Sequence, residues 1–232
     1  MKVLQINSVC GIRSTGRICT DIAEVLQQQG HECKIAYGRE TVPEKYQHLA
    51  VRIGSDLSVK LDGLKTRLLD NTGFNSYWAT KRFLAWVKEY DPDIIHLHNL
   101  HGYYLHLPSL FAYLKKKKLP VVWTLHDCWA YTGHCAYYTT AVDAPPAGPV
   151  KRRRAETHTV GCERWTVGCG NCVLKHSYPE SLIFDRSAAN WQDKRRLFTS
   201  LDHMVLTTPS DWLQSEVKRS FLKDGTYPLS EE

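Results

Sequence analysis

The sequence predicts an α/β protein built on a parallel, doubly wound sheet, and two observations lead to this fold class. Short apolar segments alternate along the chain with segments in which apolar residues recur every three or four positions. The first unit reads as strand, glycine-containing turn, helix and strand, which makes its two strands parallel. A chain that repeats this pattern is typical of a parallel sheet with helices packed on it.

The first unit occupies residues 2–37. Residues 2–7 predict a short buried strand, residues 8–16 a turn with two glycines, and residues 31–37 a second strand. The helix between them has one apolar stripe and stops at Gly30, because glycine is favoured just past a helix end. The residues of this stripe are Ile18, Ile22, Val25 and Leu26.

The later elements follow from the same rules. Apolar stripes predict helices near residues 57–69, 83–90, 107–114 and 213–221, and apolar runs predict strands at residues 93–98, 120–125 and 203–207. Asp91-Pro92 ends the second of these helices, because the residue before proline disfavours the helical region. Ser210 is placed to cap the last helix through its hydroxyl oxygen.

One segment interrupts the alternation, from Cys128 to Tyr178. It is about 50 residues long and contains five of the eight cysteines. Loops of this length inside a compact domain are usually functional or separately stabilised. Within it, residues 139–159 have the character of an insertion, with two proline-containing turns and the basic run at residues 151–154.

The composition excludes several classes of protein. The chain has 232 residues with 43% hydrophobic residues, which is enough for a sizeable folded domain. No segment approaches the roughly 18 apolar residues of a membrane span, and the first residues lack a targeting segment. We therefore expect a cytoplasmic protein, in which structural disulfides are disfavoured.

The net charge of +6 suits phosphate-rich partners or an anionic membrane surface, although basic runs such as residues 115–118 are often only solvated helix ends.

Polar residues follow three of the predicted strands at their carboxyl ends, where open α/β sheets bind ligands. The first group is the turn with Gly11 and Gly16, which allows close backbone approach at a helix N-terminus and favours an anion. It is not the dinucleotide fingerprint, because the two glycines are five residues apart. Many such turns contain two glycines, so this signal is weak by itself.

The second and third groups contain histidines. His96 and His98 lie two residues apart and therefore share one face of a strand, as a metal pair or as packed histidines. His126 and Asp127 directly follow the next apolar strand. His126 exchanges protons near neutral pH, and Asp127 is suited to orient it or to act as a base. The alternative for this pair is a helix cap or a local turn.

The cysteines of the long segment predict a structural zinc site. Cys169 and Cys172 form a C-x-x-C motif with a glycine inside, and four thiolates suit tetrahedral zinc. The favoured set is Cys135, Cys162, Cys169 and Cys172, with Cys128 and His134 as alternative ligands. Packed thiols or a redox motif are the other interpretations. Cys10, Cys19 and Cys33 have the pattern of ordinary buried thiols.

Several motifs together resemble bacterial family 4 glycosyltransferases, in particular the branch that builds colanic acid, capsular and other exopolysaccharide repeats. These are DIIHLHN at residues 93–99, VVWTLHDCW at 121–129, TGHC at 132–135, GCERW at 161–165, GCGNC at 168–172 and TPSDWL at 208–213. The resemblance implies the N-terminal, Rossmann-like half of a GT-B fold over residues 1–222, with a cysteine-rich insertion at 128–178 and a linker at 223–232. The C-terminal donor-binding domain of that family is not found in this sequence.

The resemblance also implies the chemistry. It implies retaining transfer of a hexosyl group from a nucleotide sugar to a lipid-linked saccharide without a catalytic metal, through electrostatic stabilisation of the leaving group. His126 would contact the transferred sugar, with Asp127 beside it. The donor phosphates would lie near Gly11, Arg13, Gly16 and Arg17, and His98, Asn99 and Tyr103 would shape the acceptor side.

The partners expected from this interpretation are the nucleotide sugar, the lipid-linked acceptor and, peripherally, the inner membrane. A separate chain with the donor-binding domain, or a homodimer, would complete the enzyme. The alternative hypothesis is that the chain is a non-catalytic partner subunit or a truncated domain, which needs a separate donor-binding chain. A zinc-stabilised nucleic-acid-binding protein is a third class, which the cysteine spacing disfavours because 26 residues separate Cys135 from Cys162 and no recognition helix follows the last pair. We therefore expect no nucleic acid partner.

Overall fold

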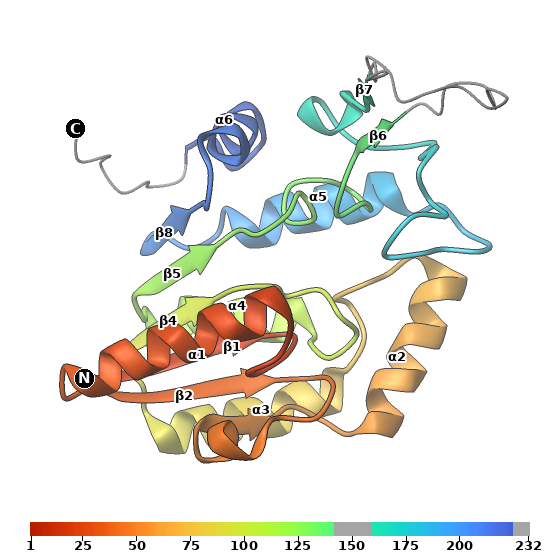
Figure 1. The fold of residues 1–232 in the computed structure, drawn as a ribbon. Helices are drawn as coiled ribbons and strands as arrows, with labels where there is room; N and C mark the ends of the chain where they lie inside the picture. Colours follow the sequence, from red (N-terminus) through yellow and green to blue (C-terminus); the bar gives the residue numbers. More distant parts are fainter. Residues whose placement is uncertain (142–158, 225–232) are drawn as a thin grey trace, which may run out of the picture.

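The computed structural model describes residues 1–141 and 159–224 (Figure 1). Its strands are β1 (Lys2–Asn7), β2 (Glu32–Tyr37), β3 (Ala50–Arg52), β4 (Ile94–Leu97), β5 (Val121–Thr124), β6 (Thr139–Ala141), β7 (Thr159–Gly161) and β8 (Met204–Thr207). Its α-helices are α1 (Arg13–Gln28), α2 (Asp56–Leu69), α3 (Tyr77–Tyr90), α4 (Leu107–Lys117), α5 (Ser187–Phe198) and α6 (Asp211–Arg219). Two short 3-10 helices, η1 (Glu44–Leu49) and η2 (Arg164–Thr166), complete the described elements.

Six parallel strands form the central sheet in the order β3-β2-β1-β4-β5-β8. The chain builds outward from β1 to β3, then returns to the middle and builds outward in the other direction from β4 to β8. The order therefore reverses between β1 and β4, which are direct neighbours. The predicted α/β, Rossmann-like fold class is confirmed, and the carboxyl ends of β1 and β4 mark its topological switch point.

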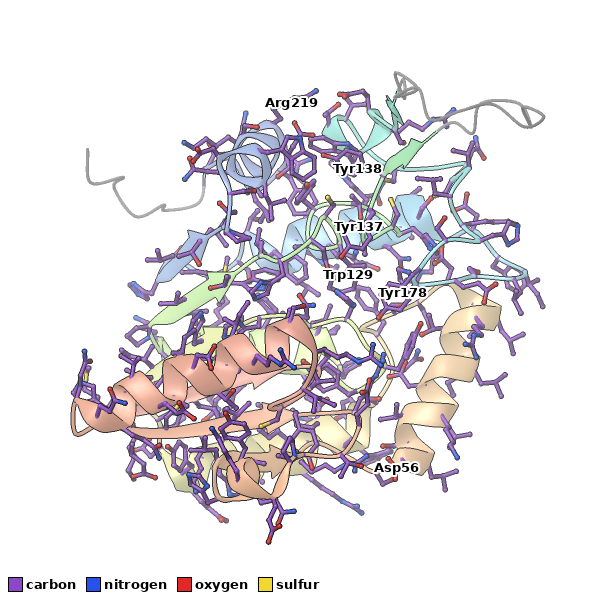
Figure 2. All side chains as sticks on the ribbon, viewed as in Figure 1. Asp56, Trp129, Tyr137, Tyr138, Tyr178 and Arg219 are labelled. Atoms are coloured by element: carbon purple, nitrogen blue, oxygen red, sulfur yellow. The ribbon has the colours of Figure 1, made fainter. Side chains whose placement is uncertain are left out.

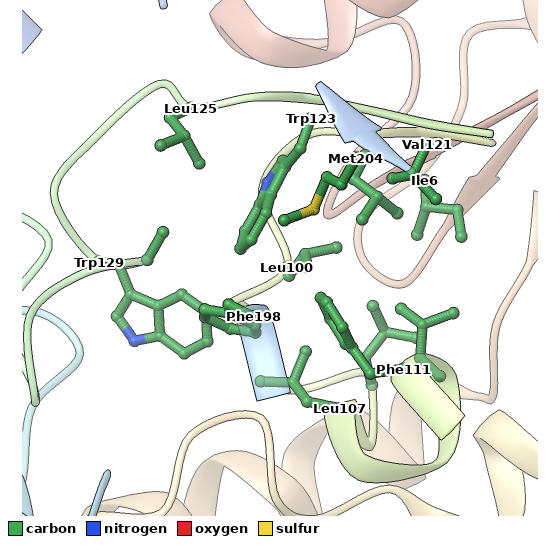
Figure 3. Packing of buried hydrophobic residues seen from close by; sticks show 14 of the residues in the cluster. Ile6, Leu100, Leu107, Phe111, Val121, Trp123, Leu125, Trp129, Phe198 and Met204 are labelled. Atoms are coloured by element: carbon green, nitrogen blue, oxygen red, sulfur yellow. The ribbon is translucent and has the colours of Figure 1, made fainter. Parts of the chain in front are cut away.

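Helices cover both faces of this sheet (Figure 1). Val3, Cys33 and Ile35 point from the strands into a core beneath α1, whereas the alternating residues Leu4 and Ile6 belong to the core on the opposite face. Large aromatic residues fill this second core, shown in Figure 3. The ring centroids of Phe111 and Phe198 lie 4.9 Å apart, and those of Trp123 and Phe198 lie 4.7 Å apart in an edge-to-face arrangement.

The boundaries of several elements correct the sequence-based expectations. The turn predicted for residues 8–16 is shorter, because α1 already begins at Arg13 and includes Gly16. The short strand β3 was missed, since three residues are too few to show a period. The cap is confirmed, as the Ser210 hydroxyl oxygen accepts a hydrogen bond from the backbone N–H of Leu213. The lysines at residues 115–118 lie exposed at the end of α4, which agrees with the interpretation of this run as a solvated helix end.

The cysteine-rich segment packs onto the sheet domain instead of projecting as a loop. Trp129, Tyr131, Tyr138 and Trp165 are buried in the same core as the sheet residues. Strands β6 and β7 form an antiparallel pair within the segment. The residues between these strands, with the predicted basic run at 151–154, lie outside the described residues. Large apolar side chains thus explain how so long a connection is held.

Candidate functional site

The site forms where β1, β4 and β5 end. The segments that follow these strands are the glycine turn, residues 98–106 and residues 125–138. The three groups of polar residues that the sequence places after strands therefore lie at one edge of the sheet. Figure 2 labels Trp129, Tyr137 and Tyr178 in this region, beside the sticks of the loop residues. Residues from these three segments and from the segment that carries Tyr178 therefore contribute to one surface.

Asn7 joins the first two strand ends. Its side chain is fully buried, and its amide N–H groups donate to the Val9 carbonyl oxygen at 2.8 Å and to the Thr15 hydroxyl at 3.2 Å. Its side-chain oxygen accepts the backbone N–H of Asn99 at 3.2 Å. A polar residue at the end of a buried strand thereby ties the glycine turn to the loop after β4.

The glycine turn brings backbone close to the start of α1. Gly11 has a φ of +72°, and its N–H donates to the Gly16 carbonyl oxygen at 3.1 Å. A Cβ on Gly16 would lie 3.1 Å from the Gly11 nitrogen, so both glycines are required for this approach. The N-cap residue is Ile12, which has no side-chain oxygen, and the first turn of α1 contains no acidic residue. The N–H groups of this turn are suited to an anion.

Arg13 begins α1 and Arg17 lies one turn further along it, and both are exposed. Arg13 donates from Nε to the carboxylate of Glu40 at 2.8 Å, and this hydrogen bond raises the pKa of its guanidinium. Glu40 also lies 3.6 Å from Arg39. The predicted phosphate-binding arginine is thus paired with a carboxylate, which an incoming phosphate would have to displace.

A chain of hydrogen bonds runs from α1 to His126. The Gln5 amide donates to the carbonyl oxygen of Cys19 at 2.8 Å, and the Gln5 side-chain oxygen lies 3.1 Å from Nε2 of His98. Nδ1 of His98 lies 3.0 Å from Nε2 of His126. The Gln5 oxygen only accepts, so His98 carries its proton on Nε2 and accepts at Nδ1 from His126. Nδ1 of a neutral His126 is left with a lone pair for an external donor.

Burial keeps these histidines neutral. Burial, with the neighbouring imidazoles, lowers the pKa of His98 well below its usual value, and burial lowers the pKa of His126 as well. Burial lowers the pKa of His96 to about 4, and Nε2 of His96 lies 2.8 Å from the Thr124 hydroxyl. His98 is only 1% exposed and lies beneath His126. In this structure His98 is thus too buried for the predicted direct contact with an acceptor, and its hydrogen bond helps to hold the His126 ring.

Asp127 is not hydrogen-bonded to His126. One of its carboxylate oxygens lies 2.7 Å from Nε2 of His101, and the other accepts the backbone N–H of Trp129 at 2.9 Å. Burial opposes its ionisation, but His101 and the Trp129 N–H hold the pKa of the carboxyl below its usual value. Nδ1 of His101 in turn lies 3.1 Å from the Tyr178 hydroxyl. Asp127 thus anchors the start of the cysteine-rich segment and reaches His126 only through its charge.

The predicted acceptor-side residues Asn99 and Tyr103 follow β4. The carbonyl oxygen of Asn99 accepts the hydroxyl of Tyr104 at 2.8 Å. Tyr103 is half-buried with a φ of +68°, and the Arg39 guanidinium lies 5.7 Å from its ring centroid. Arg39 also lies close enough to Tyr178 for its charge to oppose the rise that burial causes in the pKa of the hydroxyl. The arginine therefore links this loop to the cysteine-rich segment at the edge of the site.

The four favoured cysteines lie together. Cys135, Cys162, Cys169 and Cys172 line one small cavity of about 20 Å³, and none is in a disulfide. The backbone N–H of Gly133 donates to the Cys169 sulfur at 3.1 Å. Burial, with the other thiols, raises the pKa of Cys135 to about 12. Within residues 1–141 and 159–224, no three His, Cys, Asp or Glu side chains already form a metal-binding group.

The two alternative ligands have other contacts. His134 lines the cysteine cavity, but its Nδ1 lies 2.5 Å from the Asp70 carboxylate and its Nε2 lies 3.3 Å from the Ser177 carbonyl oxygen. Cys128 hydrogen-bonds the Tyr131 side chain and does not line the cavity. Of the two alternative ligands, only His134 therefore lies at the cavity, where it is already held by Asp70.

Sequence reasoning missed four residues that hold the site, which are Gln5, Asn7, Arg39 and Lys194, and it assigned no partner to His101. The first two are polar residues inside a buried strand, and that break in the apolar pattern was the available signal. Lys194 lies on α5, fully buried, where no sequence pattern distinguishes it from an exposed lysine.

Comparison with protein families decides the identity. A model of glycosyltransferase family 4 matches residues 15–167, which is well over half of the chain. The chain belongs to glycosyltransferase family 4. The family resemblance inferred from the sequence motifs is therefore confirmed, and the ends of β4 and β5 lie within the matched residues.

The relatives of this family 4 domain are longer proteins. The chain is 26% identical over 211 residues to "Putative colanic acid biosynthesis glycosyl transferase WcaC" of Escherichia coli (strain K12). That match covers 87% of this chain and 46% of that protein, so the chain spans less than half the length of this relative. Among solved structures, "Spinosyn Rhamnosyltransferase SpnG complexed with thymidine diphosphate" is similar at 14% identity with a TM-score of 0.34, covering 90% of this chain and 65% of that one.

Proposed function

We propose that this chain forms the acceptor-side half of a retaining glycosyltransferase that transfers a hexosyl group from a nucleotide sugar to a lipid-linked saccharide in cell-surface polysaccharide synthesis. The hydrogen-bonded series from Gln5 through His98 to His126 carries the proposal. It directs a neutral imidazole lone pair to the carboxyl edge of the sheet, where a sugar hydroxyl can donate to it.

The reaction needs positioning and charge stabilisation rather than a metal. The bond between the anomeric carbon and the donor phosphate breaks, a bond to the acceptor oxygen forms on the same face, and the acceptor proton leaves with the phosphate. In this scheme His126 holds the transferred sugar. The N–H groups of the first turn of α1, with Arg13 and Arg17, approach the diphosphate and stabilise its negative charge.

The test is a transfer assay with a full-length protein containing this chain. His126→Ala should lower kcat about 100-fold or more, because the sugar loses the group that positions it. His203→Ala is the matched control, since His203 is exposed at the amino end of β8, on the opposite edge of the sheet. Full activity of the His126→Ala protein would remove this residue from the mechanism.

Donor recognition can be measured on the chain itself. Thermal shift against UDP-, GDP- and dTDP-sugars reports binding, because a ligand of the native state stabilises it by mass action. If one nucleotide sugar raises the melting temperature of the wild type but not that of Gly16→Val, the donor phosphates bind at the glycine turn. A shift that survives this substitution would place them elsewhere.

We also propose that Cys135, Cys162, Cys169 and Cys172 bind a structural zinc ion, with the shared cavity of reduced thiols as support. A divalent cation would reverse the effect of burial on the thiols, because zinc binds thiolates and releases their protons. The N–H of Gly133 already points at one sulfur and would stabilise its negative charge. Because the sulfurs do not form a metal-binding group among the described residues, the metal would have to draw them together.

A buried cation lies beside this cluster. Lys194 is 1% exposed, and its ammonium donates to the carbonyl oxygens of Trp129 at 2.7 Å and Thr132 at 2.9 Å. The thiols of Cys169 and Cys135 both lie close enough to interact with its charge. Four thiolates around one zinc ion have a net charge of about −2, which a buried ammonium partly balances.

Metal content provides the test. The purified chain should contain about one zinc per chain by mass spectrometry, and Cys172→Ser should lose it while Cys128→Ser retains it. Chelation should lower the melting temperature of the wild type and of Cys128→Ser alike. A metal-free native protein whose melting temperature is unaffected by chelator and by added zinc would refute the zinc site.

A further inference from the structure

Helix α2 is oriented with its polar side inward. Asp62, Gly63 and Thr66 are its buried residues, whereas the leucines of the helix face outward. The exposed fractions are 67% for Leu57, 50% for Leu61, 54% for Leu64 and 37% for Leu68. Surface helices of globular proteins normally bury their apolar stripe. Figure 1 shows α2 at the margin of the molecule.

Hydrogen bonds fix this orientation. The Asp62 carboxylate accepts from the Ser76 hydroxyl at 2.5 Å, from the Asn75 amide at 3.1 Å and from the Thr66 hydroxyl at 3.3 Å. Turning the leucines inward would leave this carboxylate and its donors without these partners, at a large cost. The outward position of the leucines is therefore built into the fold.

The leucine stripe continues onto a second exposed apolar segment, Leu182–Phe184. The N–H of Leu182 donates to the carbonyl oxygen of Arg67 at 2.7 Å, and the N–H of Phe184 donates to that of Leu68 at 3.4 Å. Leu182, Ile183 and Phe184 are 52%, 57% and 56% exposed. Two parts of the chain more than 100 residues apart in sequence thus form one apolar surface, which we call the leucine surface.

Positive charges border the leucine surface. At about 100° per residue, Leu57, Leu61, Leu64 and Leu68 fall within one narrow sector of α2. Lys60 and Arg67 lie on one side of this sector and Lys65 on the other, and all three are exposed. Trp78, 77% exposed, lines a groove together with Leu61 and Lys65. Leucines flanked by lysines and an exposed indole are typical of helices that lie in a membrane interface.

We propose that the leucine surface docks the protein on a bilayer that contains anionic phospholipid, with the leucines among the acyl chains and the basic residues at the headgroups. The composition favours a bilayer over a protein partner, because leucine is under-represented among the residues that dominate protein interfaces. The inference rests on the proposed function insofar as a lipid-linked acceptor requires the site to lie at a membrane. The docking itself depends only on α2, Leu182–Phe184 and the neighbouring Trp78.

Vesicle co-sedimentation tests the docking. The chain should bind vesicles of equal parts phosphatidylcholine and phosphatidylglycerol, and bind phosphatidylcholine alone weakly. The double substitution Leu61→Glu, Leu64→Glu should reduce partitioning at least about tenfold, and Lys60→Glu with Lys65→Glu should abolish the preference for anionic vesicles. The matched control is Val25→Glu, which alters an aliphatic side chain 51% exposed on α1.

Absence of binding to anionic vesicles would overturn the proposal, and so would equal binding by the wild type and the leucine variant. A dimer in sedimentation velocity that the leucine substitutions dissociate would assign the surface to a second copy of the chain and also overturn it. Circular dichroism and melting temperature confirm folding of each variant. Nucleotide-sugar binding is measured in parallel, so a failure of the proposed transfer function and a failure of membrane docking give separate results.

Discussion

Replacing Gln5 by methionine tests whether the series of hydrogen bonds behind His126 holds the site. Gln5 is fully buried and makes hydrogen bonds to His98 and to the Cys19 carbonyl oxygen. Methionine has a similar length and flexibility, so the substitution leaves little cavity. It does leave the Nε2–H of His98 buried without its acceptor.

The magnitude follows from these two contacts. An unpaired buried N–H costs about 1–3 kcal/mol and the lost bond to Cys19 about 1 kcal/mol, so the free energy of unfolding should fall by roughly 2–4 kcal/mol. For a chain of this size the melting temperature should fall by about 5–15 °C. Gln28→Met is the control, since Gln28 is exposed on α1 and its replacement should change stability by less than about 0.5 kcal/mol.

Urea unfolding gives the free energies, and nitrogen NMR of the imidazoles gives the tautomers. In the wild type His126 should carry its proton on Nε2, and in Gln5→Met this preference should weaken because His98 is no longer held in one tautomer. A double-mutant cycle with His98→Phe should give a coupling energy of at least about 1 kcal/mol. Additive single substitutions, or an unchanged tautomer in Gln5→Met, would refute the reasoning.

Three further predictions concern stability. His96 has a folded-state pKa of about 4 against a usual 6.5, so the unfolded chain takes up the proton at a higher pH than the folded chain. The free energy of unfolding should therefore fall by about 3 kcal/mol as pH falls from 6.5 to 4. Urea titrations of His96→Leu at several pH values should lack this part of the pH dependence. Gly38→Ala should lower the free energy of unfolding by at least about 3 kcal/mol, because its Cβ would lie 2.1 Å from Tyr104. Gly30→Ala, with φ of +77° and no neighbouring atoms, should lower it by only about 1–2 kcal/mol in the same assay. Ser210→Ala removes the cap of α6 and should cost about 1 kcal/mol, and an unchanged unfolding midpoint would show that the cap contributes nothing.

The sequence by itself determined the fold class, most of the strands and helices, and the family. Strand and helix periods are local properties, so residues 2–7 or 57–69 reveal their structure without reference to the rest of the chain. The same holds for the cap at Ser210. Cys10, Cys19 and Cys33 were also predicted as buried thiols, and each is at most 2% exposed.

Only the tertiary structure decided which polar groups meet. Asp127 and His126 are adjacent in sequence, yet the hydrogen-bond partner of Asp127 is His101 and that of His126 is His98. The period of the leucines predicts that α2 is a helix, but Asp62 and its partners from another segment decide that the leucines face outward. Periodicity reports the shape of a segment, whereas the partner of a buried charge depends on segments brought together by the sheet order, which no local pattern contains.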